Sequence, residues 1–166
     1  MNSLHVRKAT SGDAAGIVKV LETVASERVY SAIDVVWSVG QEARYLDSIS
    51  QREAFHVAID DFQRIVGFQS LDLWSSLLPS MAHVGQVGTF LVPEWRRRGV
   101  GHQLWNVTEL FARQQAYQKL AIQVRAKNTG AQMFYRGLGF TECGRLTRQV
   151  IIDGVEDDEL LMEYFL

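Results

Sequence analysis

A run of arginines followed by closely spaced glycines is the stretch of the sequence whose residue types most clearly indicate ligand binding. It reads RRRGVG over residues 96–101, and apolar residues then recur at helical spacing over residues 100–111. The first turn of a helix presents unpaired backbone N–H groups and the positive end of the helix dipole, so it binds phosphate. Glycine lets a ligand approach the backbone, and arginine adds charge and directed donors. The stretch therefore predicts a local diphosphate site in a chain whose formal net charge is only -2.

The spacing of this turn limits which ligand it can bind. The arginines of an isolated basic turn can also simply be solvated, and this alternative stays open. A nicotinamide-dinucleotide fingerprint needs a third glycine where the chain has Leu104, and a carboxylate about 20 residues further on, where residues 119–124 have none. A nucleoside-triphosphate loop needs Gly-Lys-Ser/Thr, which the sequence lacks. A dehydrogenase and an ATPase are thus disfavoured.

A second motif lies about 30 residues further along a predicted short helix. Asn128, Ala131, Tyr135, Gly139 and Phe140 form the pattern N-x-x-A-x-x-x-Y-x-x-x-G-F. Residues four apart share a helix face, so Ala131 and Tyr135 lie on the same side. Taken alone, Tyr135 can be an aromatic side chain packed on a sheet, and Asn128 can be a helix cap.

Together the two motifs resemble the GNAT N-acetyltransferase superfamily, from about residue 55 to the end of the chain. The resemblance implies a splayed central sheet, with acetyl-coenzyme A (acetyl-CoA) lying in the opening and no metal. It also implies direct transfer of the acetyl group to an amine. We expect the acceptor to be a primary amine of a small molecule, such as an amino acid, a polyamine or a related amine. Protein N-terminal or lysine acetylation, and a non-catalytic acyl-CoA-binding module, are the alternatives.

The resemblance also assigns roles to individual residues. Tyr135 would be the catalytic acid beside the sulfur, since a phenol with a pKa of about 10 is neutral at pH 7 and can protonate a departing thiolate. Backbone groups of Phe90 and Leu91 would line the pantetheine arm, and the amides of residues 97–102 would hold the pyrophosphate. The expected cofactor-binding residues are Phe90, Leu91, Arg96, Arg97, Arg98, Gly99, Val100, Gly101, His102, Asn128 and Tyr135.

The base that would deprotonate the acceptor has no clear candidate. An alkyl ammonium with a pKa of about 10.4 must lose a proton before it can attack a thioester. Members of the superfamily often place a carboxylate on the strand before the cofactor turn, but residues 83–92 contain no Asp or Glu. His83 is a candidate by type but fits a solvated strand start, and Glu94 beside Pro93 fits a loop. The base therefore stays unassigned.

Composition and hydrophobic patterning limit the expected number of domains, the location and the partners. The length suits a single N-acetyltransferase domain over residues 1–166. A lone cysteine, Cys143, and the lack of a signal-like or membrane-spanning apolar run favour the cytoplasm. The near-neutral charge gives no field for nucleic acid. We expect a small-molecule amine as partner, with no nucleic acid and no membrane, and a homodimer because dimers are frequent in the superfamily.

The periodicity predicts strands and helices in the order β, α, α, β, β, β, α, β, α, β, β. This order indicates an α+β or mixed α/β fold, and the resemblance specifies an acyl-CoA N-acyltransferase fold of about six to seven strands with helices on both faces. Trp95, Trp105 and Phe134 are expected to pack in the core or at its edge rather than stack on adenine. Residues 27–50, residues 74–82 and the final hairpin would form the acceptor wall.

Overall fold

The computed structural model describes residues 4–166, and within them the strands and helices follow the predicted order. The strands are β1 (His5–Lys8), β2 (Ala54–Ile59), β3 (Ile65–Leu73), β4 (Val84–Leu91), β5 (Lys119–Arg125), β6 (Thr141–Ile152) and β7 (Val155–Phe165). The helices are α1 (Ala14–Ser26), α2 (Val39–Ser48), α3 (Val100–Gln114) and α4 (Thr129–Leu138). Residues 1–3, which belong to the expected single domain, lie outside the described residues.

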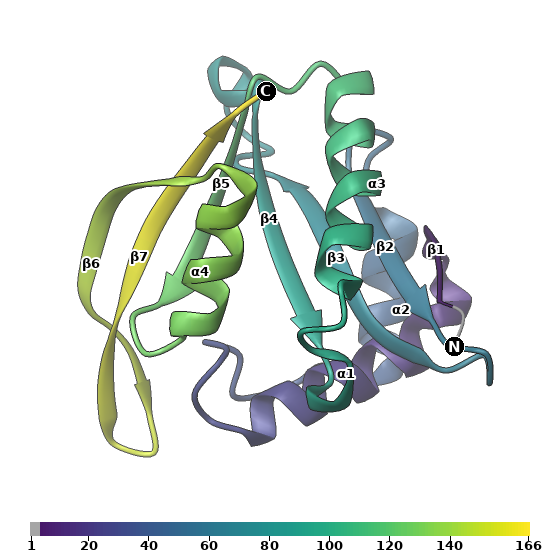
Figure 1. The fold of residues 1–166 in the computed structure, drawn as a ribbon. Helices are drawn as coiled ribbons and strands as arrows, with labels where there is room; N and C mark the ends of the chain where they lie inside the picture. The colour runs from purple at the N-terminus through teal and green to yellow at the C-terminus, as the bar shows by residue number, and fades with distance from the viewer. Residues whose placement is uncertain (1–3) are drawn as a thin grey trace.

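The described strands form one mixed sheet of seven strands in the order β1-β2-β3-β4-β5-β7-β6. Neighbouring strands are antiparallel except β4 and β5, which run parallel. Helices α3 and α4 cover one face of the sheet, and α1 and α2 cover the other (Figure 1). The mixed sheet with helices on both faces confirms the predicted fold class.

The two parallel strands at the centre of the sheet part after only three residue pairs. The last pair is Gln86 with Ala121, although β4 continues to Leu91 and β5 to Arg125. Figure 1 shows the two strands diverging toward the start of α3. Beyond the last pair, β4 is paired only with β3, and β5 only with β7. The sheet is therefore splayed, and we call the space between β4 after Gln86 and β5 after Ala121 the opening.

Local sequence signals explain where several elements begin and end. The predicted capped start at Thr10 is a capping box with Asp13 on a short 3-10 turn, and α1 follows from Ala14. Helix α4 ends at Gly139, whose φ of 102° is the left-handed conformation that favours glycine at a helix end. The predicted Asp153-Gly154 turn joins β6 to β7, with positive φ at both residues.

Candidate active site

The turn between β4 and α3 has the geometry of an anion site. Gly99 caps α3 with a φ of 78°, and the first bond of the helix runs from the N–H of Gln103 to the carbonyl of Gly99 at 3.1 Å. The amides of residues 100–102 therefore have no partner within the helix. A Cβ added at Gly99 would meet nothing within 4 Å, so no side chain crowds this residue at the start of the helix. The first turn of α3 can thus receive an anion through its backbone, as the sequence predicts.

The three arginines of this turn differ in what they contact. Arg96 makes a bidentate ion pair with Glu27 at 2.8 and 2.5 Å, donates to the carbonyl of Leu91 at 3.0 Å, and lies over the ring of Tyr30. Its guanidinium is thus engaged by the protein, and its contact with the cofactor stays a prediction. The sequence could not reveal this, because Glu27 lies 69 residues away.

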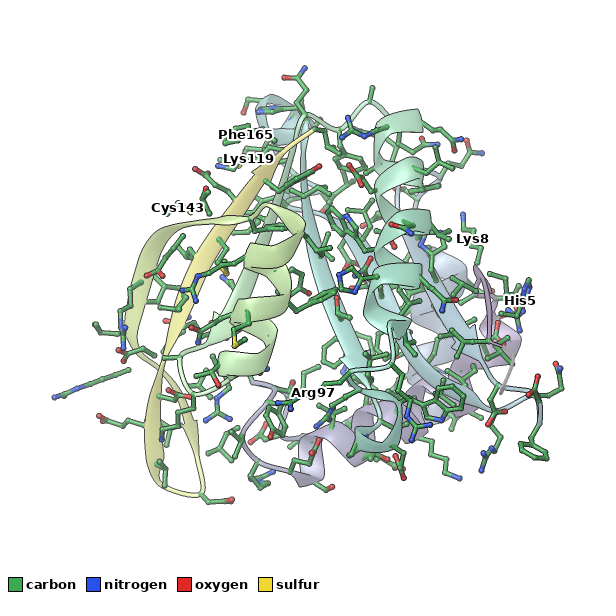
Figure 2. All side chains as sticks on the ribbon, in the orientation of Figure 1. His5, Lys8, Arg97, Lys119, Cys143 and Phe165 are labelled. Carbon is green, nitrogen blue, oxygen red and sulfur yellow. The ribbon has the colours of Figure 1, made fainter. Side chains whose placement is uncertain are left out.

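Arg97 and Arg98 remain exposed at the same turn. Arg98 lies over the ring of Trp95, with 5.7 Å between its guanidinium carbon and the ring centroid. Arg97 makes no ion pair or hydrogen bond with another residue of 4–166, and Figure 2 places it at the end of the sheet where β4 finishes and α3 begins. These two side chains can therefore add positive charge beside the free amides.

Tyr135 lies on the face of α4 that packs on the sheet and is only 4% exposed. Its hydroxyl is 2.6 Å from the hydroxyl of Thr89 on β4, and Thr89 in turn accepts a bond of 2.8 Å from the side-chain amide of Gln69 on β3. Burial raises the pKa of Tyr135 to about 12, and the Thr89 contact opposes this rise. Tyr135 is thus a neutral phenol at the edge of the opening, held by a hydrogen-bond chain that crosses two strands.

Neither Thr89 nor Gln69 was singled out from the sequence. Gln69 is fully buried, and its carbonyl oxygen Oε1 has no hydrogen-bond partner among the described residues. The available signal was a glutamine inside the apolar run IVGFQSL, because a polar residue at a buried strand position needs a bonding partner. Gln69 and Thr89 are direct cross-strand neighbours, a pairing that the register of β3 and β4 settles.

Replacing Thr89 with valine is expected to lower the free energy of unfolding by about 1–3 kcal/mol, since the isosteric change leaves a buried amide and a buried phenol without a partner. Thr89→Ser, which keeps the hydroxyl, should retain most of that stability. Urea unfolding of both variants measures the difference. Equal stability of the valine variant and the wild type would show that the hydroxyl does not connect Gln69 and Tyr135.

The register also decides which backbone groups of β4 point toward the opening. The N–H of Trp74 bonds the carbonyl of Val84, and the N–H of Val92 bonds the carbonyl of Val66. Backbone groups alternate along an antiparallel pair, so the even-numbered residues of β4, Phe90 among them, direct their N–H and C=O groups to β3. Thr89 and Leu91 point theirs the other way. Leu91 and Thr89 thus turn their backbone groups toward the opening and Phe90 turns its own to β3, while the contact of Phe90 and Leu91 with the pantetheine arm stays a prediction.

Asn128 caps α4 and also holds the segment that follows α1. Its side-chain oxygen accepts the N–H of Ala131 at 3.0 Å, and its side-chain amide donates to the carbonyl of Tyr30 at 3.1 Å. On β5, the buried Arg125 bonds Asp157 at 2.8 Å and donates to the carbonyls of Arg28 and Ser31. Together with the ion pair between Arg96 and Glu27, these bonds tie residues 27–31, here called the strap, to both sides of the opening.

The sequence-based candidates for the base lie away from this place. His83 is exposed and precedes β4, and six residues at about 3.3 Å each put it about 20 Å along the strand from Thr89. Glu94 is exposed on the short 3-10 turn Pro93–Trp95. His83 is therefore at the far end of β4 from the wide part of the opening, and Glu94 lies beyond the other end of the strand.

The aromatic residues near the turn pack as expected. Trp105 is buried in the core beneath α3, where it contacts Phe140 and Tyr164. Trp95 packs against the smaller core cluster beside β2 and β3. The ring of Phe134 lies where a Cβ added at Gly101 would approach to 3.0 Å, which explains the need for glycine where α3 passes α4.

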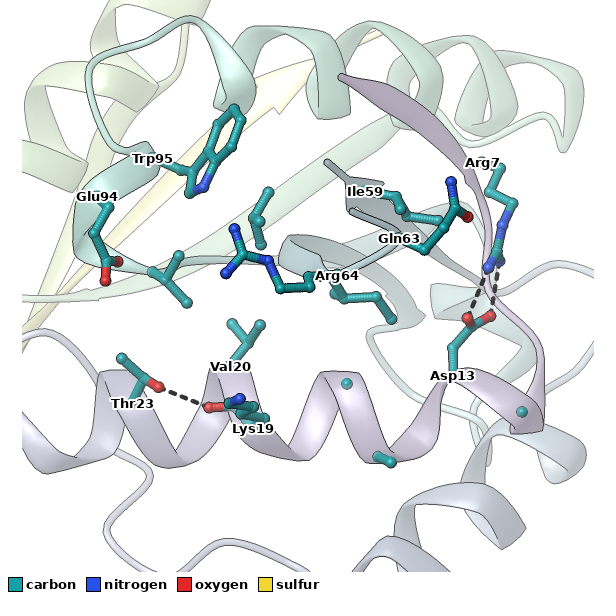
Figure 3. Close-up of a pocket in the computed structure, with 16 residues that line it drawn as sticks. Arg7, Asp13, Lys19, Val20, Thr23, Ile59, Gln63, Arg64, Glu94 and Trp95 are labelled. Atoms are coloured by element: carbon teal, nitrogen blue, oxygen red, sulfur yellow. Dashed lines mark hydrogen bonds and ion pairs between the residues drawn. The ribbon is translucent and has the colours of Figure 1, made fainter. Parts of the chain in front are cut away.

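A groove of about 740 Å³ lies elsewhere, between α1, the β2–β3 turn and the Pro93–Trp95 turn (Figure 3). Arg7 and Asp13 are paired across one end of it, and Arg64, which is paired with Asp60, extends into it below Trp95.

Within residues 4–166 no three His, Cys, Asp or Glu side chains gather to hold a metal ion. None of the described helices is long and apolar enough to cross a membrane.

The splayed sheet, the open first turn of α3 and the buried phenol beside the opening together define an acyl-CoA N-acyltransferase fold. Residues 18–156 match the family described as "Acetyltransferase (GNAT) domain". The chain therefore belongs to the GNAT acetyltransferases, which are transferases that use acetyl-CoA as the acyl donor. The match begins well before residue 55, where the two motifs first placed the resemblance. A search of curated proteins gave no significant match.

Solved structures agree with this fold. A GNAT phosphinothricin acetyltransferase from Sinorhizobium meliloti in complex with acetyl-CoA has a TM-score of 0.90 at 17% identity, over 98% of this chain and 88% of that one. A GNAT acetyltransferase from Streptococcus pneumoniae has a TM-score of 0.89 at 21% identity, over 99% and 100%. A ribosomal-protein-alanine N-acetyltransferase from Brucella melitensis has a TM-score of 0.89 at 20% identity, over 98% and 99%.

Proposed function

We propose that this protein transfers the acetyl group of acetyl-CoA directly to the primary amine of a small molecule, such as an amino acid, a polyamine or a related amine. The observation that carries the proposal is the parting of β4 from β5 after Gln86, with free helix amides at its wide end and the hydroxyl of Tyr135 along its edge. A linear thioester with a diphosphate at one end fits such an arrangement.

In this proposal the cofactor lies along β4. The pyrophosphate binds the amides of the turn at residues 97–102, where Gly99, Val100, Gly101 and His102 begin the helix. The pantetheine arm bonds the inward backbone groups of Thr89 and Leu91. Arg97 and Arg98 add charge from the side, and Asn128, fixed at the start of α4, faces the cofactor from across the opening. Arg96 contributes by fixing the turn to α1.

Replacing Arg97 with alanine is expected to weaken the affinity for coenzyme A (CoA) about tenfold, because one charge-assisted contact to phosphate is worth about 1.5–3 kcal/mol at best and this side chain is exposed. The loss should shrink as salt is raised. Arg113→Ala, at the far end of α3, is the matched control and should leave the affinity unchanged. Calorimetry at two salt concentrations checks both, and equal weakening in the two variants would contradict the placement.

The chemistry proposed for Tyr135 is proton donation to the leaving sulfur. The amine nitrogen forms a bond to the thioester carbon, the carbon–sulfur bond breaks, and the phenol passes its proton to the sulfur and takes up the proton that the nitrogen loses. The phenol stays protonated at neutral pH, because burial raises the pKa of Tyr135 to about 12. Donation from the hydroxyl of Thr89 would stabilise the oxygen as its proton leaves.

The acceptor class is supported by aromatic side chains near the opening and by one of the similar solved structures. Tyr30 on the strap and Trp37 before α2 are large, partly exposed aromatic side chains that would limit the acceptor to a compact molecule. The phosphinothricin acetyltransferase by its name acts on a small molecule. The ribosomal-protein-alanine N-acetyltransferase favours acetylation of protein N-termini as the second candidate, because its structure is about as similar.

The direct test measures thiol release from acetyl-CoA with a panel of amino acids and polyamines and with peptides bearing free N-termini or lysines. The proposal expects free amines to be turned over faster than every peptide. Faster turnover of a peptide would favour the second candidate. Calorimetric binding of CoA without turnover on any acceptor would indicate the non-catalytic module, and no binding of CoA would contradict the proposal altogether.

Two further expectations from the sequence remain part of the proposal. The cytoplasm is supported by Cys143, whose exposed thiol on β6 is unpaired and suits a reducing compartment. A homodimer is supported by large apolar side chains at the surface of the 74–82 loop, which are Trp74, Leu77, Leu78 and Met81.

A further inference from the structure

Asp72 lies on β3 beside the point where the opening begins. It is the cross-strand partner of Gln86, which is the last residue of β4 paired with β5. Directly opposed residues have Cβ atoms about 4.5–5.5 Å apart. Thr89 faces α4, so the alternation of side chains turns Gln86 and Asp72 to the other face of the sheet, which α2 covers. Asp72 therefore lies on the opposite face of the sheet from Tyr135, one strand away from the point where the opening begins.

A phenol from α2 holds the carboxylate in place. The hydroxyl of Tyr45 donates to Oδ1 of Asp72 at 2.5 Å. The ring of Tyr45 is itself fixed by edge contacts with Trp37 and Phe55, at centroid distances of 5.4 and 5.8 Å. Asp72 is thus an oriented group rather than a free surface side chain.

Asp72 differs from the other bonded aspartates because no cation accompanies it. Each ion-paired aspartate among the described residues has an arginine: Asp13 with Arg7, Asp60 with Arg64, Asp153 with Arg28, Asp157 with Arg125 and Asp158 with Arg145. Asp72 is partly buried and has no ion pair within residues 4–166. A partly buried carboxylate is normally paired, so this position favours a cationic ligand.

The ionised groups that act on Asp72 are carboxylates, whereas its two tyrosine neighbours are neutral and Arg52 lies over the ring of one of them, Tyr117. Glu42 and Tyr45 face it from α2, Glu53 from the turn before β2, and Tyr117 from the connection before β5. Burial, reinforced by the charge of Glu53, raises the pKa of Asp72, and its bonds with Tyr45 and Ser70 oppose the rise. A raised pKa brings the carboxyl group of Asp72 closer to the pKa of an alkyl ammonium, and this makes the carboxylate a better base.

The two neighbouring glutamates are less suited to this role. Both carboxylate oxygens of Glu53 accept backbone bonds, from the N–H of Ser50 at 2.9 Å and from that of Leu73 at 3.2 Å. Glu42 lies on the buried face of α2 and is only 3% exposed. Gln86, by contrast, makes no side-chain hydrogen bond with another residue of 4–166 and is free to contact an acceptor beside Asp72.

We propose that Asp72 is the general base that takes the proton of the acceptor ammonium, with Tyr45 positioning it and Gln86 aligning the acceptor. This inference rests on the proposed acetyl transfer. Asp72 removes one proton from the ammonium, and the nitrogen lone pair forms the bond to the thioester carbon. As the carbon–sulfur bond breaks, Tyr135 passes its proton to the sulfur and takes up the second proton of the nitrogen. Asp72 then releases its proton to water, which leaves an amide, a thiol and one proton.

The test compares Asp72→Asn with Glu53→Gln on an amine that the wild type acetylates, from pH 6 to pH 10. The asparagine variant keeps an acceptor for Tyr45 but cannot take a proton, so its kcat/KM should fall about 10²-fold or more at pH 7. The loss of kcat/KM relative to the wild type should become smaller toward pH 10, because an amine with a pKa of about 10.4 increasingly deprotonates without a base. Glu53→Gln can keep only one of the two backbone bonds, because an amide has a single accepting oxygen, and it removes a charge that raises the pKa of Asp72, so a loss of activity much smaller than that of Asp72→Asn is expected.

The outcomes separate this inference from the proposed function. Wild-type turnover with an equally active Asp72→Asn would overturn Asp72 alone, and so would a deficit that stays constant across the pH range. No turnover of any amine by the wild type would overturn the acetyl transfer and the base together. Calorimetry with CoA shows whether the asparagine variant keeps a folded cofactor site, and it should bind CoA as the wild type does.

A second variant tests the same assignment through its pH profile. Tyr45→Phe keeps the ring contacts but removes the bond that lowers the pKa of Asp72. A base must be deprotonated to act, so activity is lost as pH falls through its pKa. Removing Tyr45's hydroxyl should therefore move the acid limb of kcat/KM to higher pH. An unchanged acid limb would show that the limb belongs to another group.

Discussion

Replacing Tyr135 with phenylalanine is expected to lower the rate of acetyl transfer about 10²-fold or more, while the affinity for acetyl-CoA stays close to that of the wild type. The substitution removes only the hydroxyl that lies 2.6 Å from Thr89, and the ring keeps its edge contact with Phe140. The leaving thiolate then has no proton donor. Single-turnover kinetics with saturating acetyl-CoA, together with calorimetry, separates the loss of chemistry from any loss of binding.

Tyr117 provides a matched control for this substitution. It is equally buried, burial raises its pKa to about 12 as well, and its hydroxyl donates to the carbonyl of Arg52 at 2.9 Å. Tyr117→Phe thus removes a comparable hydroxyl from the core without touching Thr89 and should leave single-turnover rates within about threefold of the wild type. Equal losses in the two variants would mean that Tyr135 supports the fold rather than the reaction.

Replacing Arg125 with methionine is expected to lower the free energy of unfolding by about 3–5 kcal/mol. The side chains of Arg125 and Asp157 are each only 3% exposed, so the substitution leaves a buried carboxylate without its partner. It also frees the carbonyls of Arg28 and Ser31, which anchor the strap. Urea unfolding measures the loss in stability, and limited proteolysis should reveal earlier cleavage within residues 27–31.

Two comparisons make this prediction specific. Arg145→Met breaks the exposed pair with Asp158, and exposed pairs contribute about 0–1 kcal/mol, so little change is expected. Adding Asp157→Leu to the methionine variant removes the stranded carboxylate and should recover much of the stability. A small effect of Arg125→Met, or no recovery in the double variant, would show that this buried pair does not fix the strap.

The order of elements could be predicted because local patterns determine it. The capping box at Thr10, the apolar stripe of α3 and the Asp153-Gly154 turn each depend on residues close together in the sequence. The segment before α2 was the least regular, and in the structure it is held by contacts from distant elements. Arg125 and Asn128 both reach it from almost a hundred residues away.

The candidate site was predicted in part for the same reason. The turn at Gly99 and the motif around Tyr135 carry their own spacing and were visible in the sequence. The roles of Arg96 and Asp72 depend on partners 69 and 27 residues away, Glu27 and Tyr45, and no local pattern specifies such pairs. Which backbone groups of Phe90 and Thr89 turn toward the opening follows from strand register, which the sequence alone left undetermined.

The most direct measurement is the position of CoA in crystals of the protein grown with it. We predict the pyrophosphate on the amides of residues 97–102, the pantetheine arm beside Thr89 and Leu91, and the sulfur within hydrogen-bond reach of Tyr135. Cofactor bound in the groove between α1 and the β2–β3 turn, or a sulfur remote from that hydroxyl, would contradict the proposed mechanism.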